Sequence, residues 1–361
     1  MALSQVGLER LGTSVTDKIG KKKNLIINGA MQVAQRGTVT GITSSQYAGP
    51  DRFRFGIASH GTFTVSQDSS APTGSGFANS LKLDCTTADT SVASGTAVYF
   101  QHKLEGQDCQ RIKKGTSSAE QLAVQFHVKS NKTGTYAFQL SDNDNSRSFT
   151  TTYSISSADT WEKKTIIIPA DTTGALGNDN NVSLTFNFWL VAGTDFTSGA
   201  ASTTWYSHVN ANAAKGHTVN IADSTSNEWY MTGFQVEAGS VHTDFEFEFF
   251  SETLRKCQRY FQKLELHGSH VVMGNDAART SRIPQRLGTV MRTTPTSQNL
   301  VKDTAAVRTN QNGTSGGSNF SSPSAVSPRA DDIIEINVLC GSGGLNTVHY
   351  SGATVELTAE L

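Results

Sequence analysis

The chain has 361 residues, which is long for a single hydrophobic core and suits two domains. Only 17% of the residues are charged, the formal net charge is −1 and 36% are hydrophobic. These values argue against electrostatic capture of nucleic acid and against a membrane-embedded protein.

The first twenty residues lack the basic start and the unbroken apolar run of a secretory signal. No segment approaches the roughly 18 apolar residues of a membrane helix. The sequence therefore predicts synthesis in the cytosol without membrane insertion. The cysteines show no metal-ligand spacing: Cys85, Cys109, Cys257 and Cys340. We expect buried thiols, with a disulfide between Cys85 and Cys109 as the alternative.

Residues 1–23 form a separate N-terminal arm. Its apolar side chains recur at the spacing of one helix face: Leu8, Leu11, Val15 and Ile19. Because a short helix with an apolar stripe needs a partner, the arm either folds back on its own domain or binds another protein or another copy of the chain. The three lysines at 21–23 suit a solvated joint and favour the attachment peptide.

From residue 24 to 250 the pattern is that of β-strands and turns. An Asn28-Gly29 pair between two apolar runs predicts a tight hairpin. Nine alternating or β-branched runs follow: Thr62–Ser66, Ser80–Cys85, Thr96–Leu104, Leu122–Lys129, Tyr136–Leu140, Ser148–Ile155, Lys164–Ile168, Ser183–Val191 and Trp229–Glu237. In the eighth run, the alternation of Phe186 and Phe188 with polar residues predicts one buried face. The sequence therefore predicts an all-β chain with a jelly-roll β-sandwich, similar in layout to carbohydrate-binding modules.

A connecting helix is predicted at 251–263, with Cys257 in its apolar stripe. A smaller C-terminal β domain is predicted at 264–361. Its candidate strands are Val271–Met273, Leu287–Met291, Ile333–Leu339 and Val355–Leu357. Within it, residues 309–328 are rich in Asn, Gly and Ser and predict a flexible loop.

Motifs for catalysis or metal binding are not found in this sequence. The histidines show no zinc-enzyme spacing, and there is no nucleophile elbow or phosphate-binding loop. Glu246 and Glu248 are the best acidic pair for glycoside hydrolysis, but alternation in a Phe-rich run directs both toward solvent. The Asp142–Asn145 segment resembles part of a calcium loop, and turn chemistry explains it equally well. No enzyme, cofactor or metal site is expected.

Aromatic side chains are the candidates for sugar binding. Trp205 and Tyr206 lie in a segment rich in small residues and are the candidate glycan contacts, because exposed rings offer apolar platforms to sugars. The alternative is that both rings anchor a loop on the core. Trp161 and Trp229 open strands, and we expect them to close the ends of the sandwich.

Several stretches resemble one family of bacteriophage virion proteins from phages of aquatic bacteria, described as tail fibre or minor structural proteins. The motifs are NLIINGAMQVAQRG (24–37), GPDRF (49–53), GTY (134–136), DTWEKKTI (159–166), ADSTSNEW (222–229), GFQVEAG (233–239), TDFE (243–246) and CQRYFQK (257–263). The resemblance covers roughly residues 20–265. It implies a structural part of a virus particle that forms a homo-oligomer, a trimer in fibre-like members. The family's Asp-Arg-aromatic motif falls on Asp51 and Arg52, which we expect to form a locking pair beside Phe53.

The leading hypothesis is therefore a non-enzymatic virion protein of fibre, knob or decoration type, located in the phage particle. Its arm would bind other virion proteins of the capsid or tail, and its β domains would face the host surface. The alternative is a carbohydrate-binding module or depolymerase that acts on host-surface polysaccharide. We predict Asn28, Gly29, Asp51, Arg52 and Cys257 to be structural rather than ligand-binding residues.

Overall fold

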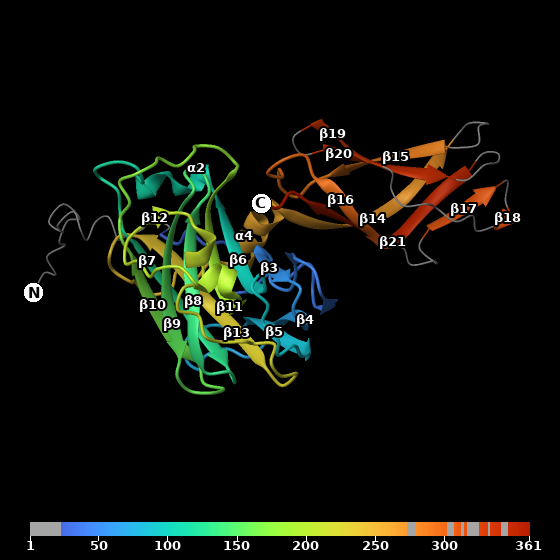
Figure 1. Cartoon of the computed structure of the whole chain (residues 1–361). Coiled ribbons are helices and arrows are strands. Elements are labelled where there is room, and N and C mark those ends of the chain that lie inside the picture. Colours follow the sequence, from blue (N-terminus) through green and yellow to red (C-terminus); the bar gives the residue numbers. More distant parts are fainter. Residues whose placement is uncertain are drawn as a thin grey trace, which may run out of the picture.

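The computed structural model describes residues 23–272, 279–301, 307–311, 314–315, 325–330, 333–340 and 346–361. They form a β-sandwich and a smaller, elongated β unit that projects from one side of it (Figure 1). The arm residues Leu8, Leu11, Val15 and Ile19 lie outside the described part of the chain. Among the helices that the structure describes, none combines the length and apolarity needed to span a bilayer.

Two antiparallel sheets make the sandwich. The first has the order β1 (Val39–Ile42), β4 (Thr62–Asp68), β5 (Ser80–Thr87), β13 (Glu228–Ala238), β7 (Leu122–Ser130), β10 (Glu162–Ile168). The second has the order β12 (Tyr206–Ser207), β9 (Arg147–Ile155), β8 (Gly134–Asp142), β11 (Val182–Ala192), β6 (Ala97–Glu105), β3 (Phe53–Ala58), β2 (Gln46–Tyr47). Short helical turns lie in the loops: α2 (Gly106–Cys109), η2 (Gln110–Ile112), α3 (Thr194–Thr197) and η3 (Asn210–Asn212). Each of the nine predicted runs coincides with one strand, and the predicted all-β jelly-roll β-sandwich is confirmed.

Aromatic rings fill the space between the sheets. Phe126, Phe138 and Phe188 are fully buried, and the Phe188 ring centroid lies 5.1 Å from that of Phe126 and 5.2 Å from that of Phe138. Trp229, expected at an end of the sandwich, is fully buried and stacks on Phe100 at 5.7 Å. Because burying one such side chain contributes about 1.5–3 kcal/mol, these rings provide much of the stability of the sandwich.

The prediction of one buried face for β11 is wrong, because both of its faces are covered. Its outward-facing Trp189 is only 4% exposed. The ring packs on Tyr99 at 5.0 Å and on Phe196 of α3 at 5.1 Å, with Ala213 and Ala214 beside it. The loop that carries α3 and η3 therefore forms a third layer over the second sheet.

The turn at Asn28-Gly29 is present, but the predicted hairpin is wrong. The two runs do not pair with each other. The Leu25 N–H donates to the Val236 carbonyl of β13 at 2.9 Å, and the Phe234 N–H of β13 donates to the Gly29 carbonyl at 3.0 Å. The Val33 carbonyl of the second run accepts the Asp51 N–H at 2.9 Å. An irregularity in β13, where Gly233 has a φ of +65°, leaves backbone groups free for the bonds with Leu25 and Gly29. The segment therefore joins the sandwich as a docked strip rather than as a β-hairpin.

The connecting helix is shorter than predicted. α4 spans Phe250–Gln258 rather than 251–263, with Thr253 and Cys257 on its buried side. β14 (Phe261–Val272) begins three residues later, because from Phe261 onward the chain pairs with β21 (Asn346–Thr358).

The second unit consists of two small sheets. One contains β14, β21, β16 (Thr296–Val301), β17 (Val307–Gln311) and β18 (Thr314–Ser315), and the other contains β15 (Arg279–Arg286), β20 (Ile333–Cys340) and β19 (Ala325–Ala330). The strand predicted at 287–291 is wrong, since these residues form a turn that buries Leu287 and Met291. The described parts of the 309–328 segment, predicted as a flexible loop, belong to β17, β18 and β19. Backbone pairing with β21 and β20 orders them despite their few apolar side chains.

The docked strip requires glycine at position 29. A Cβ atom there would lie 2.0 Å from the Phe234 carbonyl oxygen, so Gly29→Ala should lower the free energy of unfolding by about 2 kcal/mol or more. Gly95→Ala is the matched control, because its Cβ would meet no atom nearer than 3.6 Å and should cost less than about 0.5 kcal/mol. Equal destabilisation of both variants in chemical denaturation would contradict this role.

Candidate functional site

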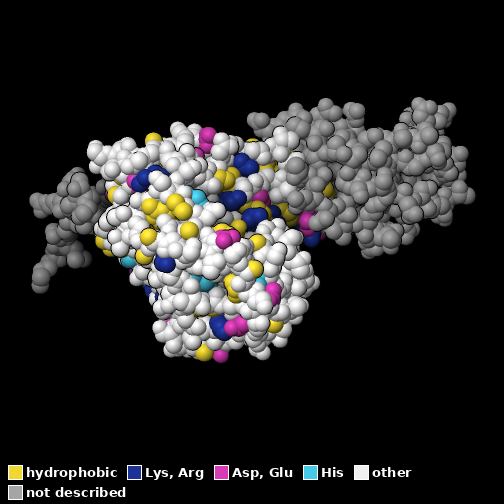
Figure 2. Space-filling view, in the orientation of Figure 1, with side chains coloured by type: hydrophobic (Ala, Val, Ile, Leu, Met, Phe, Trp, Pro, Cys, Tyr) yellow, Lys and Arg dark blue, Asp and Glu magenta, His cyan; other side chains and the backbone are white. Residues whose placement is uncertain are grey.

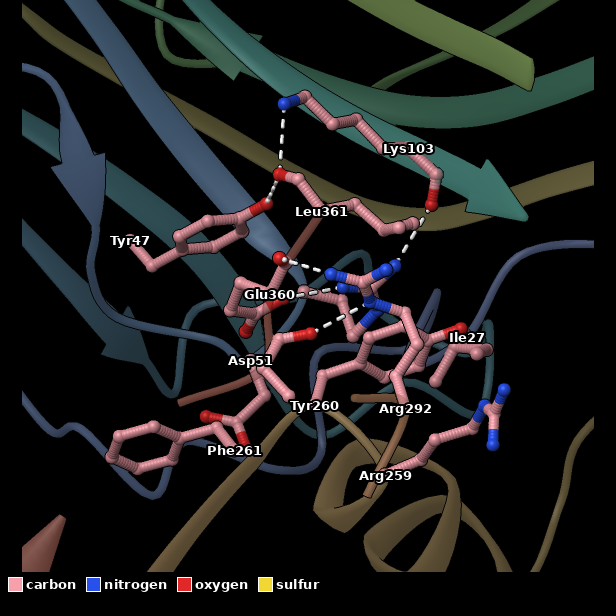
Figure 3. Close-up of polar contacts among 12 residues, drawn as sticks. Ile27, Tyr47, Asp51, Lys103, Arg259, Tyr260, Phe261, Arg292, Glu360 and Leu361 are labelled. Atoms are coloured by element: carbon pink, nitrogen blue, oxygen red, sulfur yellow. Dashed lines mark hydrogen bonds and ion pairs between the residues drawn. The ribbon is translucent and has the colours of Figure 1, made fainter. Parts of the chain in front are cut away.

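The last described residues return from β21 to the sandwich and lie against the second sheet (Figure 3). The Leu361 carbonyl oxygen accepts hydrogen bonds from the Tyr47 hydroxyl at 2.7 Å and from the Lys103 ammonium at 2.8 Å. Arg292 donates to the carbonyls of Ala359 at 2.8 Å and Glu360 at 2.9 Å. These contacts join the two β units, and we call this region the junction.

Arg52 and Glu360 form an ion pair at the centre of the junction. The Arg52 side chain is 1% exposed, its guanidinium lies 3.4 Å from the centre of the Tyr260 ring, and it also donates to the Lys103 carbonyl at 2.8 Å. Burial alone would lower the pKa of Arg52, but the Glu360 carboxylate, together with Tyr260, Tyr47 and Cys257, outweighs burial and holds the pKa above its ordinary value. The guanidinium therefore stays charged inside the protein because a carboxylate 308 residues away compensates it.

The predicted locking pair of Asp51 with Arg52 is wrong. Asp51 accepts a hydrogen bond from the Gln35 N–H at 3.0 Å and lies 3.9 Å from the Arg36 guanidinium, whereas Arg52 turns to Glu360. The aromatic ring on the guanidinium is that of Tyr260 rather than Phe53. Burial raises the pKa of Asp51 to about 6, against the opposing effects of Arg36 and Gln35.

A second buried ion pair ties α4 to the sandwich. Arg259 donates two hydrogen bonds to the Glu105 carboxylate, at 2.9 Å and 2.8 Å, and the Tyr260 hydroxyl donates a third at 2.5 Å. Burial works against ionisation of Glu105, but these donors outweigh it and lower its pKa. The Gln107 amide donates a fourth hydrogen bond to this carboxylate at 2.5 Å. Four donors satisfy a carboxylate fully, so we interpret Glu105 as a structural residue.

A groove of about 920 Å³ runs along the exposed side of α4. It is lined by Ser251, Glu252, Arg255, Lys256, Arg259, Leu287, Gly288, Thr289 and Val290. A pocket of about 330 Å³ shares Lys256 and Arg259 with it and adds Arg111 and Asp108. Lys and Arg side chains also gather on the visible face where the sandwich meets the second unit (Figure 2). Of the three cations that line the groove, Lys256 pairs with Glu248 and Arg259 pairs with Glu105. Arg255 is the lining cation that best suits an anionic ligand.

The Asp142–Asn145 segment holds a lysine ammonium where a calcium loop would hold its ion. The Lys114 Nζ lies 2.5 Å from Asp142 and 3.0 Å from Asp171, and it donates to the Thr173 carbonyl at 2.8 Å. Within the described ranges, no group of three or more His, Cys, Asp or Glu side chains could hold a metal ion. Turn chemistry around an internal cation therefore accounts for this segment.

Trp205 and Tyr206, the predicted glycan contacts, are half-buried. The Trp205 indole N–H donates to the Pro169 carbonyl at 2.8 Å, and the Tyr206 hydroxyl bonds to the Thr150 hydroxyl at 2.6 Å. Trp161 is also half-buried and packs on Tyr230 at 6.2 Å. Since the polar tips of Trp205 and Tyr206 are bound within the protein, the geometry is that of loop anchors.

The Phe-rich segment after β13 has the opposite orientation to the predicted one. Glu246 and Glu248 are half-buried, and the Glu246 carboxylate accepts the backbone N–H groups of Lys23 at 2.7 Å and Asn24 at 2.8 Å. Glu248 pairs with Lys256. Three phenylalanines point outward instead: Phe247, Phe249 and Phe250, here called the Phe surface. The two carboxylates thus hold backbone and lysine groups.

The cysteines Cys85, Cys109 and Cys257 are buried free thiols, so the alternative of a Cys85–Cys109 disulfide is not realised. Burial raises the pKa of Cys85 to about 11, which makes its thiolate rare at neutral pH. Cys257 is fully buried on the inner side of α4, and burial raises its pKa as well. These thiols act as small apolar side chains.

No protein-family model matches the chain, and no curated protein does. Among solved structures, the enzymatically active domain of tailspike protein 4 from bacteriophage CBA120 is similar at 11% identity and a TM-score of 0.32, covering 60% of this chain and 21% of its own. A putative sugar binding protein from Bacteroides thetaiotaomicron is similar at 10% identity and a TM-score of 0.33, covering 60% of this chain and 100% of its own. The family 11 carbohydrate-binding module of a Clostridium thermocellum cellulase is similar at 9% identity and a TM-score of 0.29, covering 57% of this chain and 97% of its own. These values identify neither a ligand nor a partner for this chain.

Removing the charge of Glu360 should destabilise the protein strongly. Glu360→Gln keeps the side-chain shape but leaves the Arg52 guanidinium buried without a counter-charge, which should cost about 3–5 kcal/mol in the free energy of unfolding. The control is Glu120→Gln in the exposed Lys113–Glu120 pair, which should cost less than about 1 kcal/mol. If urea denaturation gives the same decrease in the free energy of unfolding for both variants, the Arg52–Glu360 pair contributes no more to stability than an exposed ion pair.

Asp51 should make stability depend on pH in a defined direction. Its pKa of about 6 in the folded chain exceeds the ordinary value of 3.8, so the folded state favours the protonated carboxyl. The stability that this carboxyl contributes is present below pH 4 and is lost as the pH rises through 6. The free energy of unfolding of the native chain, measured relative to Asp51→Asn, should therefore fall between pH 4 and pH 7. A constant difference across that range would refute this assignment.

Proposed function

We propose that the chain is a non-enzymatic structural protein of a bacteriophage particle, of fibre, knob or decoration type. In this proposal the N-terminal arm attaches it to other virion proteins of the capsid or tail. The β units face outward and contact the host surface weakly, and several copies in a homo-oligomer, a trimer in the favoured case, supply the avidity.

The observation that carries the proposal is the junction, which joins two β units into one elongated body (Figure 1). A flexible linker would let the second unit move independently, whereas a buried ion pair and backbone-directed hydrogen bonds fix its direction. Fixed, elongated β modules suit a part that must hold a binding tip away from a particle. The sequence motifs shared with phage virion proteins support the same role.

The proposal is tested in the particle and in solution. Mass spectrometry of purified virions should detect the chain, and a chain lacking residues 1–23 should be missing from particles although it folds. In solution, we expect the full-length chain to be a trimer by light scattering. A chain found free in the lysate and absent from virions, or a monomer at all concentrations, would refute the structural role.

The alternative function, a carbohydrate-binding module or depolymerase, is favoured by one observation: the cation-lined groove along α4. The groove suits an acidic polysaccharide, and the exposed Arg255 that lines it can turn its guanidinium toward such a ligand. If this function holds, Arg255→Ala should weaken binding of a uronic-acid polysaccharide about tenfold, as expected for loss of one charged hydrogen bond. Lys163→Ala is the control, because it removes an exposed cation of β10 that does not line the groove. If Arg255→Ala binds the polysaccharide as tightly as the native chain, or if the native chain does not bind it, the groove is not a polysaccharide-binding site.

A further inference from the structure

The Phe surface holds the exposed phenylalanines of the described part of the chain, all within four consecutive positions. Phe247 is 48% exposed, Phe249 is 81% exposed and Phe250 is 56% exposed. Phe77 and Phe245 support Phe247 from below, with ring centroids 5.1 Å and 4.9 Å from it. Since aromatic side chains have a large apolar area to bury, exposed phenylalanines so close in the chain mark a surface that another segment covers.

The N-terminal arm starts at this surface. The described chain begins at Lys23, and the N–H groups of Lys23 and Asn24 both bind the Glu246 carboxylate, at 2.7 Å and 2.8 Å. Glu246 immediately precedes Phe247 in the chain. Ile19 lies four residues before Lys23, a reach of about 13 Å even for an extended chain. The nearest apolar residue of the arm can therefore meet the Phe surface without any rearrangement of the sandwich.

Charge also matches between the two segments. The arm carries five cations against two carboxylates: Arg10, Lys18, Lys21, Lys22 and Lys23 against Glu9 and Asp17. The 244–252 segment carries four carboxylates and no cation: Asp244, Glu246, Glu248 and Glu252. Opposite net charges would hold an amphipathic segment over the phenylalanines while its apolar stripe covers them.

We infer that the arm packs on the Phe surface of its own chain, with Leu8, Leu11, Val15 and Ile19 against Phe247, Phe249 and Phe250. The tether at Glu246 makes this docking intramolecular, so the arm is present at a high effective concentration that a free peptide would lack. A virion protein that takes the arm, as in the proposed function, must displace it from this surface. The docking itself does not depend on that function.

Hydrogen–deuterium exchange on the full-length chain tests the inference. Residues 8–19 should be protected, and Phe249→Asp/Phe250→Asp should raise their exchange rate about tenfold or more. Both substitutions lie at the exposed start of α4, where Asp is well tolerated, so the sandwich should stay folded. The control is Val209→Asp, an equally polar change at a 51% exposed side chain of the loop that carries η3, which should leave the arm protected.

The reciprocal variant Leu11→Asp/Val15→Asp should raise exchange of the arm to the same extent. Adding it to the Phe249→Asp/Phe250→Asp change should have little further effect, because both variants remove one contact. The inference fails if residues 8–19 exchange equally fast in the native chain and in the variants. It also fails if cross-linking of mixed heavy-labelled and light chains joins the arm of one copy to the Phe surface of another.

Discussion

The ion pair between Arg52 and Glu360 is the contact on which the relation between the two β units depends. A guanidinium buried in the sandwich would be strongly unfavourable by itself, because its desolvation is not repaid by neutral neighbours. The Glu360 carboxylate arrives from the far end of β21, and it can do so only when the whole second unit is folded and oriented. The Tyr260 ring on the guanidinium adds α4 to the same contact. The buried charge of Arg52 is therefore compensated only when the second unit lies in this orientation on the sandwich.

The surroundings of this pair show how the protein keeps buried polar groups satisfied. Arg292 directs its guanidinium at backbone carbonyls from both sides of the junction, those of Asn180 and Ala359 among them. Lys114 does the same inside the sandwich, where it takes the place of an ion among the carboxylates of a turn-rich loop. In both places, a side chain from a distant segment supplies the charge that a local turn needs.

Local patterns in the sequence were sufficient for most of the sandwich. Alternating runs such as 122–129 and 148–155 predict strands correctly, because the side-chain period of two survives wherever one face meets the core. The same pattern is present in β3, where Phe53, Phe55 and Ile57 alternate, but this strand was not predicted. The same reasoning also misjudged β11, because a loop from a later part of the chain covers the outer face of that strand.

The candidate sites were harder to predict for the same reason. The interacting side chains lie more than two hundred residues apart, as in the pairs Arg52–Glu360 and Glu246–Lys23. Local sequence spacing cannot predict contacts of that kind. The Phe-rich segment had one available signal: two adjacent phenylalanines, Phe249 and Phe250, cannot both follow an alternation of period two. That break shows that at least one ring must leave the inward face.

The sequence distance across the junction also has a kinetic consequence. Loop closure over 308 residues is entropically slow, and Glu360 leaves the ribosome only after every strand of the second unit has been made. The strands of the sandwich can pair earlier, but Arg52 stays without its counter-charge throughout that time. The junction is therefore the part of the described structure whose partners are synthesised furthest apart in time, and it can form only after the second unit has been made.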